Sequence, residues 1–177
     1  MAKDVADALG LERVLWIPAG EPPHKLEVPV SPAPVRLAMV RAACEADPRF
    51  EACSVEVERP GPSFMVDTVK ELTRWFPGAE LFLIVGADEF RVFDSWRDPD
   101  QIVRFVRLAV MDRAGASAVG FRDDVPGGRD AEFVPVRRID VSASEVRGRV
   151  RRGENIDHCV PDAVRAIIER EGLYLAP

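Results

Sequence analysis

Apolar runs alternate along this chain with segments whose apolar residues recur every three or four positions. The runs are short and bounded by turn residues, so we interpret them as strands, whereas the periodic segments are predicted helices. A period-two alternation over Cys53–Glu58 predicts one further, half-exposed strand. The predicted strands are 13–17, 53–58, 81–85, 106–111 and 132–136, and the predicted helices are 1–9, 35–46, 64–76, 98–105, 161–172 and the segment between Ser142 and Gly153.

Strand and helix alternate throughout, which predicts an α/β fold. In such a Rossmann-like fold, parallel strands are joined by right-handed crossovers and helices cover both faces of the sheet. Ligands bind at the carboxyl ends of the strands. Two candidate motifs, Gly86-Ala87-Asp88 and Val141-Ser142, fall directly after strands. We assign the whole chain, 1–177, to a single domain, since this length is enough for one sizeable core.

The stretch Ile139–Gly153 has the pattern of a helix start that could hold an anion. Ser142 is a good N-cap residue, and Glu145 three places later completes a capping box. The first turn of a helix has unpaired N–H groups and a positive dipole end, which a phosphate can bind. Ser144 and Arg147, three residues apart, fall on one helical face. A capped surface helix with solvated arginines fits the same spacing, and the spacing alone favours it.

Composition limits the class of partner. The net charge of −6 and the pI of about 5.1 argue against bulk binding to nucleic acid or to an anionic membrane. Six arginines between 137 and 152 form a local basic cluster, which suits a small polyanion or, equally, a solvated face. No apolar run is long enough to span a bilayer, and the first residues lack the pattern of a signal peptide, so we expect a cytoplasmic protein. The three cysteines and two histidines have no disulfide or zinc spacing.

Single residues elsewhere are ambiguous. Gly86 and Asp88 could admit a ligand and bind a ribose hydroxyl or a metal, or could form a turn with a capping aspartate. Trp96 could stack on an aromatic ring, but core packing is more common for a lone tryptophan. Lys25 follows a stiff proline segment and could contact a phosphate, although loop lysines are usually solvated. His24 is more often structural than a general base. The chain has no P-loop, G-x-G-x-x-G or G-x-S-x-G motif.

Taken together, the motifs resemble those of the bacterial nicotinate-nucleotide adenylyltransferase family of the nucleotidylyltransferase superfamily. The resemblance covers nearly the whole chain in the family's order. The resemblance rests on five segments of the sequence. They are I-P-A-G-E-P-P-H-K (17–25), R-P-G-P-S-F-M-V-D-T (59–68), L-I-V-G-A-D (83–88) with Trp96, D-V-S-A-S-E-V-R (140–147), and V-P-D-A-V with G-L-Y at the end.

The resemblance implies a transfer of AMP from ATP to nicotinate mononucleotide, which gives deamido-NAD and pyrophosphate, with Mg²⁺ bound to the phosphates. Catalysis would rest on positioning and charge neutralisation, with no covalent intermediate and no metal held by the protein alone. Arg147 would be the catalytic cation. The implied ATP-binding residues are Gly86, Ala87, Asp88, Ser142, Ser144 and Arg147, and the implied acceptor-binding residues are Lys25, Met65, Trp96 and Arg113.

The chain departs from the family pattern at three places. Ser144 replaces a threonine, and Phe64-Met65 replaces a Tyr-Thr pair, which removes a hydroxyl near the pyridine carboxylate. The opening strand with its G-G-T-F-D-P-x-H-x-G-H motif does not precede the first predicted helix. We therefore expect that the chain is an N-terminally truncated reading without its first strand, and that residues 1–177 alone have little activity.

Two other functions remain open at this point. One is a sister nucleotidylyltransferase that uses nicotinamide mononucleotide or phosphopantetheine as acceptor. The other is a non-catalytic nucleotide-binding remnant, which would bind ATP without releasing pyrophosphate.

Overall fold

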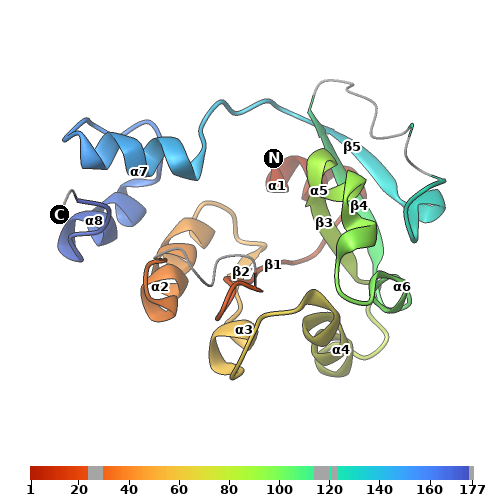
Figure 1. The fold of residues 1–177 in the computed structure, drawn as a ribbon. Coiled ribbons are helices and arrows are strands. Elements are labelled where there is room, and N and C mark those ends of the chain that lie inside the picture. The colour runs from red at the N-terminus through yellow and green to blue at the C-terminus, as the bar shows by residue number, and fades with distance from the viewer. Residues whose placement is uncertain (24–29, 114–119, 121–122, 176–177) are drawn as a thin grey trace. The chain divides into compact units, whose positions relative to one another are not determined.

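The computed structural model describes residues 1–23, 30–113, 120 and 123–175, which form two compact units. Unit 1 consists of Met1–Glu12 and Ser63–Arg138, and unit 2 consists of Arg13–Pro62 and Ile139–Pro177. Each unit combines parallel strands with helices (Figure 1). The predicted α/β class is therefore confirmed, while the assignment of 1–177 to one domain stays a prediction.

The sheet of unit 1 has the strand order β3-β4-β5, and both strand pairs are parallel. The strands are β3 (Phe82–Gly86), β4 (Arg107–Arg113) and β5 (Glu132–Val136). All three predicted strands are confirmed, with bounds that differ by at most two residues. In the register, Gly86 lies opposite Met111, so the carboxyl ends of β3 and β4 meet at one edge of the sheet.

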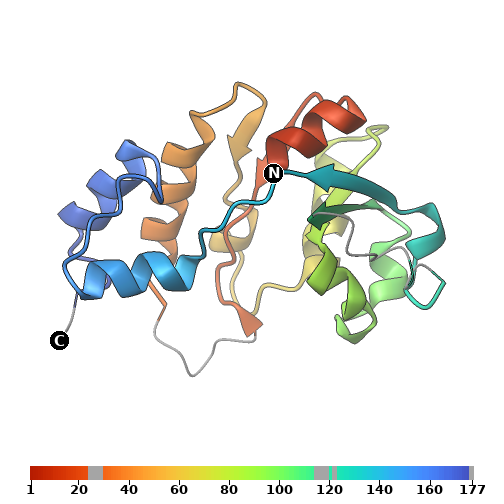
Figure 2. The same cartoon turned by 90° about the horizontal axis from the view of Figure 1, so that it is seen from above.

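Helices cover both faces of this sheet. Along β4, Leu108 and Val110 pack into one core and Ala109 into another, because successive side chains of a strand point to opposite faces. The first core includes buried residues of α4 (Met65–Trp75), α5 (Ala87–Arg91), η2 (Phe93–Ser95) and α6 (Pro99–Ile102). The second is closed by Val5 of α1 (Ala2–Leu9), which lies beside β5 (Figure 2).

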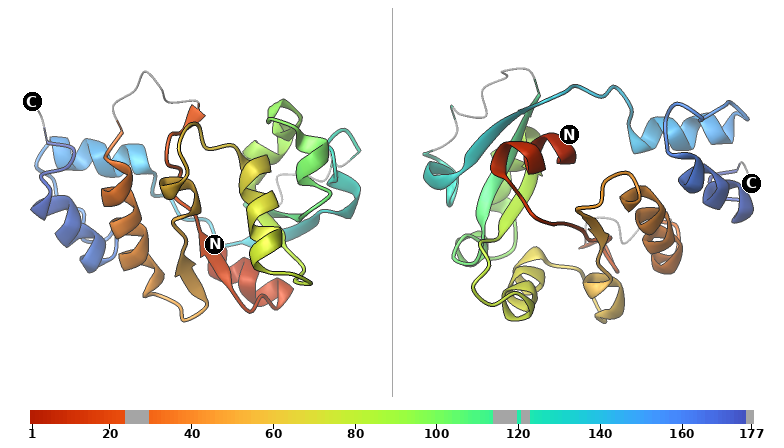
Figure 3. Two further views of the ribbon diagram at one scale, coloured as in Figure 1. Left: turned by 90° about the horizontal axis from the view of Figure 1, so that it is seen from below. Right: turned by 180° about the vertical axis from the view of Figure 1, so that it is seen from behind.

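Unit 2 contains a two-stranded parallel sheet and a helical cluster. Strand β1 (Val14–Trp16) pairs with β2 (Phe50–Ala52), and α2 (Ala33–Cys44) packs on β2 and on α8 (Asp162–Arg170). Val146 of α7 (Ala143–Arg151) joins Ile156, Val164 and Ile168 in the core between these helices (Figure 3).

Three local predictions were wrong. The alternation over 53–58 is not a strand: β2 ends at Ala52, and Val55–Glu58 is the short helix α3. Its turn closes because Val57 and Glu58 donate backbone bonds to Ser54 O at 2.8 and 3.0 Å, which a strand could not provide. Phe64 and Pro161, predicted as the first residues of their helices, are instead the N-caps of α4 and α8.

Two features of the described ranges bear on the class of protein. No helix there combines the length and the apolar character that crossing a bilayer requires. Within the same ranges, no three His, Cys, Asp or Glu side chains come together in a way that could hold a metal ion.

Candidate functional site

The start of α7 in unit 2 has the geometry that the sequence predicts. Ser142 is the N-cap, with an extended backbone (φ −116°, ψ 152°), and its Oγ accepts a hydrogen bond from Glu145 N at 3.1 Å. The carboxylate of Glu145 accepts from Arg149 Nε at 3.2 Å, so only the serine half of the predicted capping box forms. One of the orphan N–H groups of the first turn is thereby satisfied, and the others face an exposed end of the helix.

Arg147 lies on the same face of α7 as Ser144, which confirms the predicted spacing. Its Nη2 donates to Ser144 Oγ at 3.0 Å. Ser142 and Ser144 are exposed, and Arg147 is half-buried. This arrangement places two hydroxyls and a guanidinium around the positive end of a helix, where the combination of dipole and donors favours an anion.

Three other arginines of the basic cluster pair with carboxylates. Arg149 pairs with Glu145, and Arg152 donates to both oxygens of Glu154 at 2.6 and 2.9 Å. The hydrogen bond from Arg152 lowers the pKa of Glu154 and raises that of the guanidinium. Arg137 belongs to unit 1, where it pairs with Asp4 at 3.1 Å. Arg147 differs from these three arginines because its protein partner is the neutral hydroxyl of Ser144.

A hollow of about 400 Å³ adjoins the N-cap of α7. It contains polar groups that sequence reasoning did not connect with Ser142, namely Arg149, Asn155 and His158, together with Asp140, Val141, Glu145 and Cys159. The bend that brings them here depends on Asn155, whose Oδ1 accepts from Asp157 N at 2.6 Å. In the sequence, His158 stands three residues before Pro161, and this position does not predict that the turn folds back toward α7.

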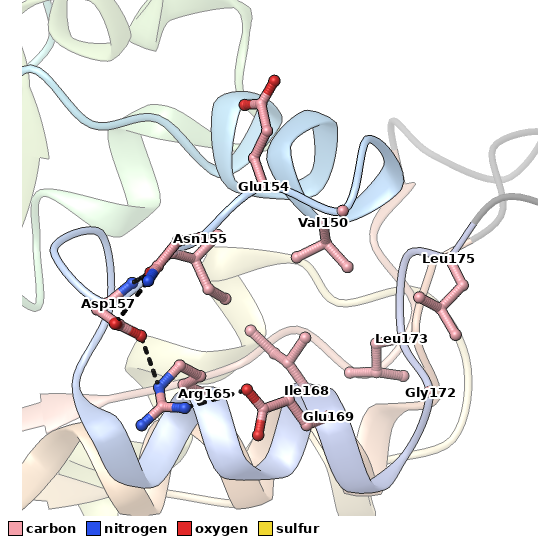
Figure 4. Close-up of a pocket in the computed structure, with 12 residues that line it drawn as sticks. Val150, Glu154, Asn155, Asp157, Arg165, Ile168, Glu169, Gly172, Leu173 and Leu175 are labelled. Atoms are coloured by element: carbon pink, nitrogen blue, oxygen red, sulfur yellow. Dashed lines mark hydrogen bonds and ion pairs between the residues drawn. The ribbon is translucent and has the colours of Figure 1, made fainter.

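A second hollow, of about 430 Å³, lies at the opposite end of α7, around Val150 and Gly153 (Figure 4). One side is apolar, with Ile168, Leu173 and Leu175, and the other carries Arg165 bonded to Asp157 and Glu169, both at 3.1 Å. Because it adjoins the carboxyl end of the helix, where the dipole disfavours anions, it does not match the predicted phosphate site.

In unit 1, the motif Gly86-Ala87-Asp88 begins with the last residue of β3, whereas the sequence predicts that the strand ends at Val85. Gly86 is both the last residue of the strand and the N-cap of α5, and the space where a Cβ would lie is open for 4 Å. The carboxylate of Asp88 is 91% exposed and accepts from Arg91 Nη1 at 3.0 Å. The backbone of this turn is thus accessible to a ligand, which is the property the prediction requires.

The carboxyl end of β4 lies beside this turn and holds a residue that sequence reasoning missed. Asp112 has a buried Oδ1 without a hydrogen-bond partner among the described residues. An acidic residue at the end of a predicted strand was visible in the sequence, but its burial was not. Arg113, predicted to bind the acceptor, is the last residue of β4.

Two of the predicted acceptor-binding residues pack against the same core in unit 1. Met65 begins α4, Trp96 follows η2, and both are partly buried against the same core. The ring of Trp96 lies 5.1 Å from that of Phe93, which is fully buried. Lys25, the remaining predicted residue, lies outside the described ranges.

The loop that leads toward Lys25 is held by close backbone contacts in unit 2. A Cβ on Gly20 would come within 2.1 Å of Glu56 O, so only glycine fits there. Arg36 bonds to Gly20 O at 2.8 Å and to Ser31 O at 3.0 Å, and Glu21 forms a bridge with Pro62.

Comparison with known proteins identifies the family. Residues 1–149 match the cytidylyltransferase-like family model. The chain is 38% identical over 173 residues to a protein of Thermus thermophilus named "Probable nicotinate-nucleotide adenylyltransferase", a match that covers 98% of this chain and 89% of that protein. A protein of the same name from Gemmatimonas aurantiaca is 42% identical over 177 residues, which cover 98% of this chain and 83% of that protein.

Solved structures agree on the fold. The nicotinic acid mononucleotide adenylyltransferase of Plasmodium falciparum in complex with NaAD superposes with a TM-score of 0.70 at 13% identity, over 98% of this chain and 89% of that one. The same enzyme complexed with APC gives a TM-score of 0.68 at 12% identity, over 97% and 89%. At this identity the likeness concerns the fold alone. With the sequence relatives above, it shows that the chain belongs to the nicotinate-nucleotide adenylyltransferase family of cytidylyltransferase-like proteins.

Proposed function

We propose that this chain transfers AMP from ATP to nicotinate mononucleotide, giving deamido-NAD and pyrophosphate in NAD biosynthesis. Family membership at 38–42% identity over almost the whole chain supports the reaction. The observation that carries it is the start of α7, where Ser142, Ser144 and Arg147 surround the positive end of a helix. No carboxylate is bonded to Arg147 within the described ranges, so its guanidinium can donate hydrogen bonds to a phosphate.

The chemistry is a single displacement at the α-phosphorus of ATP. A phosphate oxygen of the acceptor forms a bond to this phosphorus, the bond to the β-phosphate oxygen breaks, and its electron pair leaves with pyrophosphate. Negative charge grows on the phosphate oxygens in the transition state, where the N–H groups of α7 and the cation of Arg147 stabilise it most. Ser142 and Ser144 position the phosphates, and no covalent enzyme intermediate is needed.

The unit 1 residues serve the nucleotide and the acceptor. Gly86, Ala87 and Asp88 line the nucleotide site, where the open backbone of Gly86 permits close approach. Trp96 packs on the pyridine ring of the acceptor, with Met65 beside it. Lys25 is the proposed cation near a phosphate, and Arg113 is proposed to lie near the acceptor mononucleotide.

Mg²⁺ enters with ATP as part of the substrate. It prefers phosphate oxygens and water over an all-protein cage, and within the described ranges no cluster of three ligand side chains competes for it. With a net charge of −6 the protein acts on these small molecules in the cytoplasm, without a nucleic acid or membrane partner.

The test measures pyrophosphate release from MgATP with each of three acceptors, namely nicotinate mononucleotide, nicotinamide mononucleotide and phosphopantetheine. Residues 1–177 are assayed at high protein concentration, because little activity is expected of them, and the nucleotide product is identified by chromatography. We expect deamido-NAD from nicotinate mononucleotide at a low rate. Release with phosphopantetheine alone would replace the proposal with the sister enzyme, and ATP binding in calorimetry without release from any acceptor would leave only a nucleotide-binding protein.

A further inference from the structure

Arg97 lies on the aromatic ring of Phe64 in unit 1. Its Cζ is 4.3 Å from the ring centroid, within the range of a cation–π contact. Phe64 directly precedes Met65, and Arg97 directly follows Trp96. The contact therefore joins the two segments that carry the proposed acceptor-binding residues, although these segments are far apart in the sequence.

The stacked guanidinium keeps its hydrogen-bond donors available. A guanidinium carries five N–H donors, and among the described residues none of those of Arg97 makes a hydrogen bond. The nearest carboxylate, that of Asp98, has its Oδ2 3.9 Å from Arg97 Nε, which is too long for a hydrogen bond. The side chain of Arg97 is 58% exposed, so a ligand can reach these donors.

The segment around Arg97 is fixed on both sides. Before it, Trp96 N donates to Phe93 O at 3.1 Å, and the Trp96 ring rests on the fully buried Phe93. After it, Asp98 has a left-handed backbone (φ 51°), and its carbonyl accepts from Gln101 N and Ile102 N at the start of α6. Aspartate tolerates this conformation better than most residues. A preorganised cation loses less conformational entropy on binding.

We infer that Arg97 binds the carboxylate of nicotinate mononucleotide and sets the preference for this acid over nicotinamide mononucleotide. The inference rests on the proposed function and adds the residue that distinguishes an acceptor with a carboxylate from one with an amide. A planar fork of donors matches a carboxylate with two parallel hydrogen bonds, whereas an uncharged amide offers one acceptor and no charge.

The test is a calorimetric titration of each mononucleotide into the 177-residue protein and its Arg97→Gln variant. We expect the affinity for nicotinate mononucleotide to fall about 10- to 100-fold, the range for a charge-assisted hydrogen bond, toward its lower end because the site is exposed. The affinity for nicotinamide mononucleotide should change less than about threefold. Arg97→Lys keeps the charge without the fork, so we expect it to restore part of the loss.

Arg107→Gln is the matched control. Arg107 also lies over a phenylalanine, Phe82, at 5.3 Å, but at the amino end of β4, and it pairs with Glu80 and Glu132. It should leave both affinities unchanged. An equal loss for both mononucleotides in Arg97→Gln, or no loss for the acid, would overturn the inference while the proposed function stands. Binding of neither mononucleotide by the unsubstituted protein would overturn the acceptor class, and the inference with it.

Discussion

The start of α7 and the Trp96 segment differ in how the sequence encodes them. At α7, the decisive bonds join residues three apart: Ser142 to Glu145, and Ser144 to Arg147. At the Trp96 segment, the decisive contacts join different elements, since Arg97 rests on Phe64 of the α4 start and Trp96 rests on the buried Phe93. The first site is a property of one short stretch, and the second exists only when the core of unit 1 is packed.

This difference has a consequence for mutational sensitivity. A locally encoded site should tolerate changes in the core and respond to changes of its own side chains. A site built on long-range contacts should also fail when a supporting core residue is removed, because its geometry depends on that packing. The following substitutions test this contrast, in order of decreasing effect.

The largest effect is expected for Phe93→Ala. Phe93 is fully buried in the core of unit 1 and supports the Trp96 ring at 5.1 Å. Truncation of a buried phenylalanine lowers the free energy of unfolding by about 3–5 kcal/mol. Denaturant titration of the protein, monitored by near-UV circular dichroism and tryptophan fluorescence, should show this loss. Calorimetry should show weaker binding of the acceptor mononucleotide.

Val92→Ala is the control for this change. Val92 precedes Phe93 but is 49% exposed, so its truncation should alter stability by less than about 0.5 kcal/mol. If both variants bound the acceptor as tightly as the unsubstituted protein, the Trp96 segment would not depend on the core.

Arg147→Gln should produce the next largest effect, on ligand binding alone. Removing a cation that pairs with phosphate lowers affinity about 10- to 100-fold, from the value of a charge-assisted hydrogen bond. The free energy of unfolding should change by less than about 0.5 kcal/mol, because the protein partner of Arg147 is the exposed hydroxyl of Ser144. Calorimetry with MgATP measures the first quantity and denaturant titration the second.

Arg151→Gln provides the matched comparison, since Arg151 is an exposed arginine in the last turn of the same helix. It should change ATP affinity less than about twofold, because it lies at the end where the dipole disfavours phosphate. Equal losses for Arg147→Gln and Arg151→Gln would reduce the role of α7 to general basicity.

The same distinction explains what the sequence could predict about the fold. Strands such as β3 and β5 were predictable because an apolar run bounded by turn residues needs no knowledge of its partners. The segment 53–58 was not, since its alternation fits a strand, while both Val55 and Glu56, adjacent in sequence, are buried in a helical turn. Tertiary packing buries these two successive side chains, and a period-two pattern in the sequence cannot predict such packing.

The geometry of the candidate site residues followed the same rule. The placement of Ser142, Ser144 and Arg147 on one helix start was predictable because helical spacing fixes it, whereas their role came from the family resemblance. Arg97 was missed because only its position over Phe64 makes it a candidate, and nothing in the sequence around either residue indicates that contact. For Trp96 and Met65, a family resemblance supplied what spacing could not.

Ser142→Ala should have a moderate effect that isolates the cap. Loss of the bond from Glu145 N to Ser142 Oγ should lower the free energy of unfolding by about 1 kcal/mol. Ser142→Asp retains a capping oxygen, so it should restore stability, yet its negative charge should repel phosphate and weaken ATP binding. If the aspartate variant bound ATP as well as the unsubstituted protein, the phosphates would not lie at this helix start.

The smallest effect concerns the longest-range contact of unit 1, between Asp4 and Arg137, which are 133 residues apart. The hydrogen bond from Arg137 N, assisted by its guanidinium, lowers the pKa of Asp4 below the usual 3.8. A lowered pKa stabilises the fold above the unfolded-state value, and this contribution is lost as the pH falls through the folded-state pKa. Asp4→Asn should therefore be less stable than the unsubstituted protein near pH 6, and the gap should shrink steadily below about pH 4.

Denaturant titrations of both proteins at a series of pH values measure this gap directly. Asp94→Asn, which changes an exposed carboxylate in η2, is the control and should follow the unsubstituted curve at each pH. A gap that stayed constant down to pH 2 would mean that the ionised form of Asp4 does not hold α1 to the end of β5. In that case the apolar packing of Val5 against the sheet, without the ion pair of Asp4, would hold α1 in unit 1.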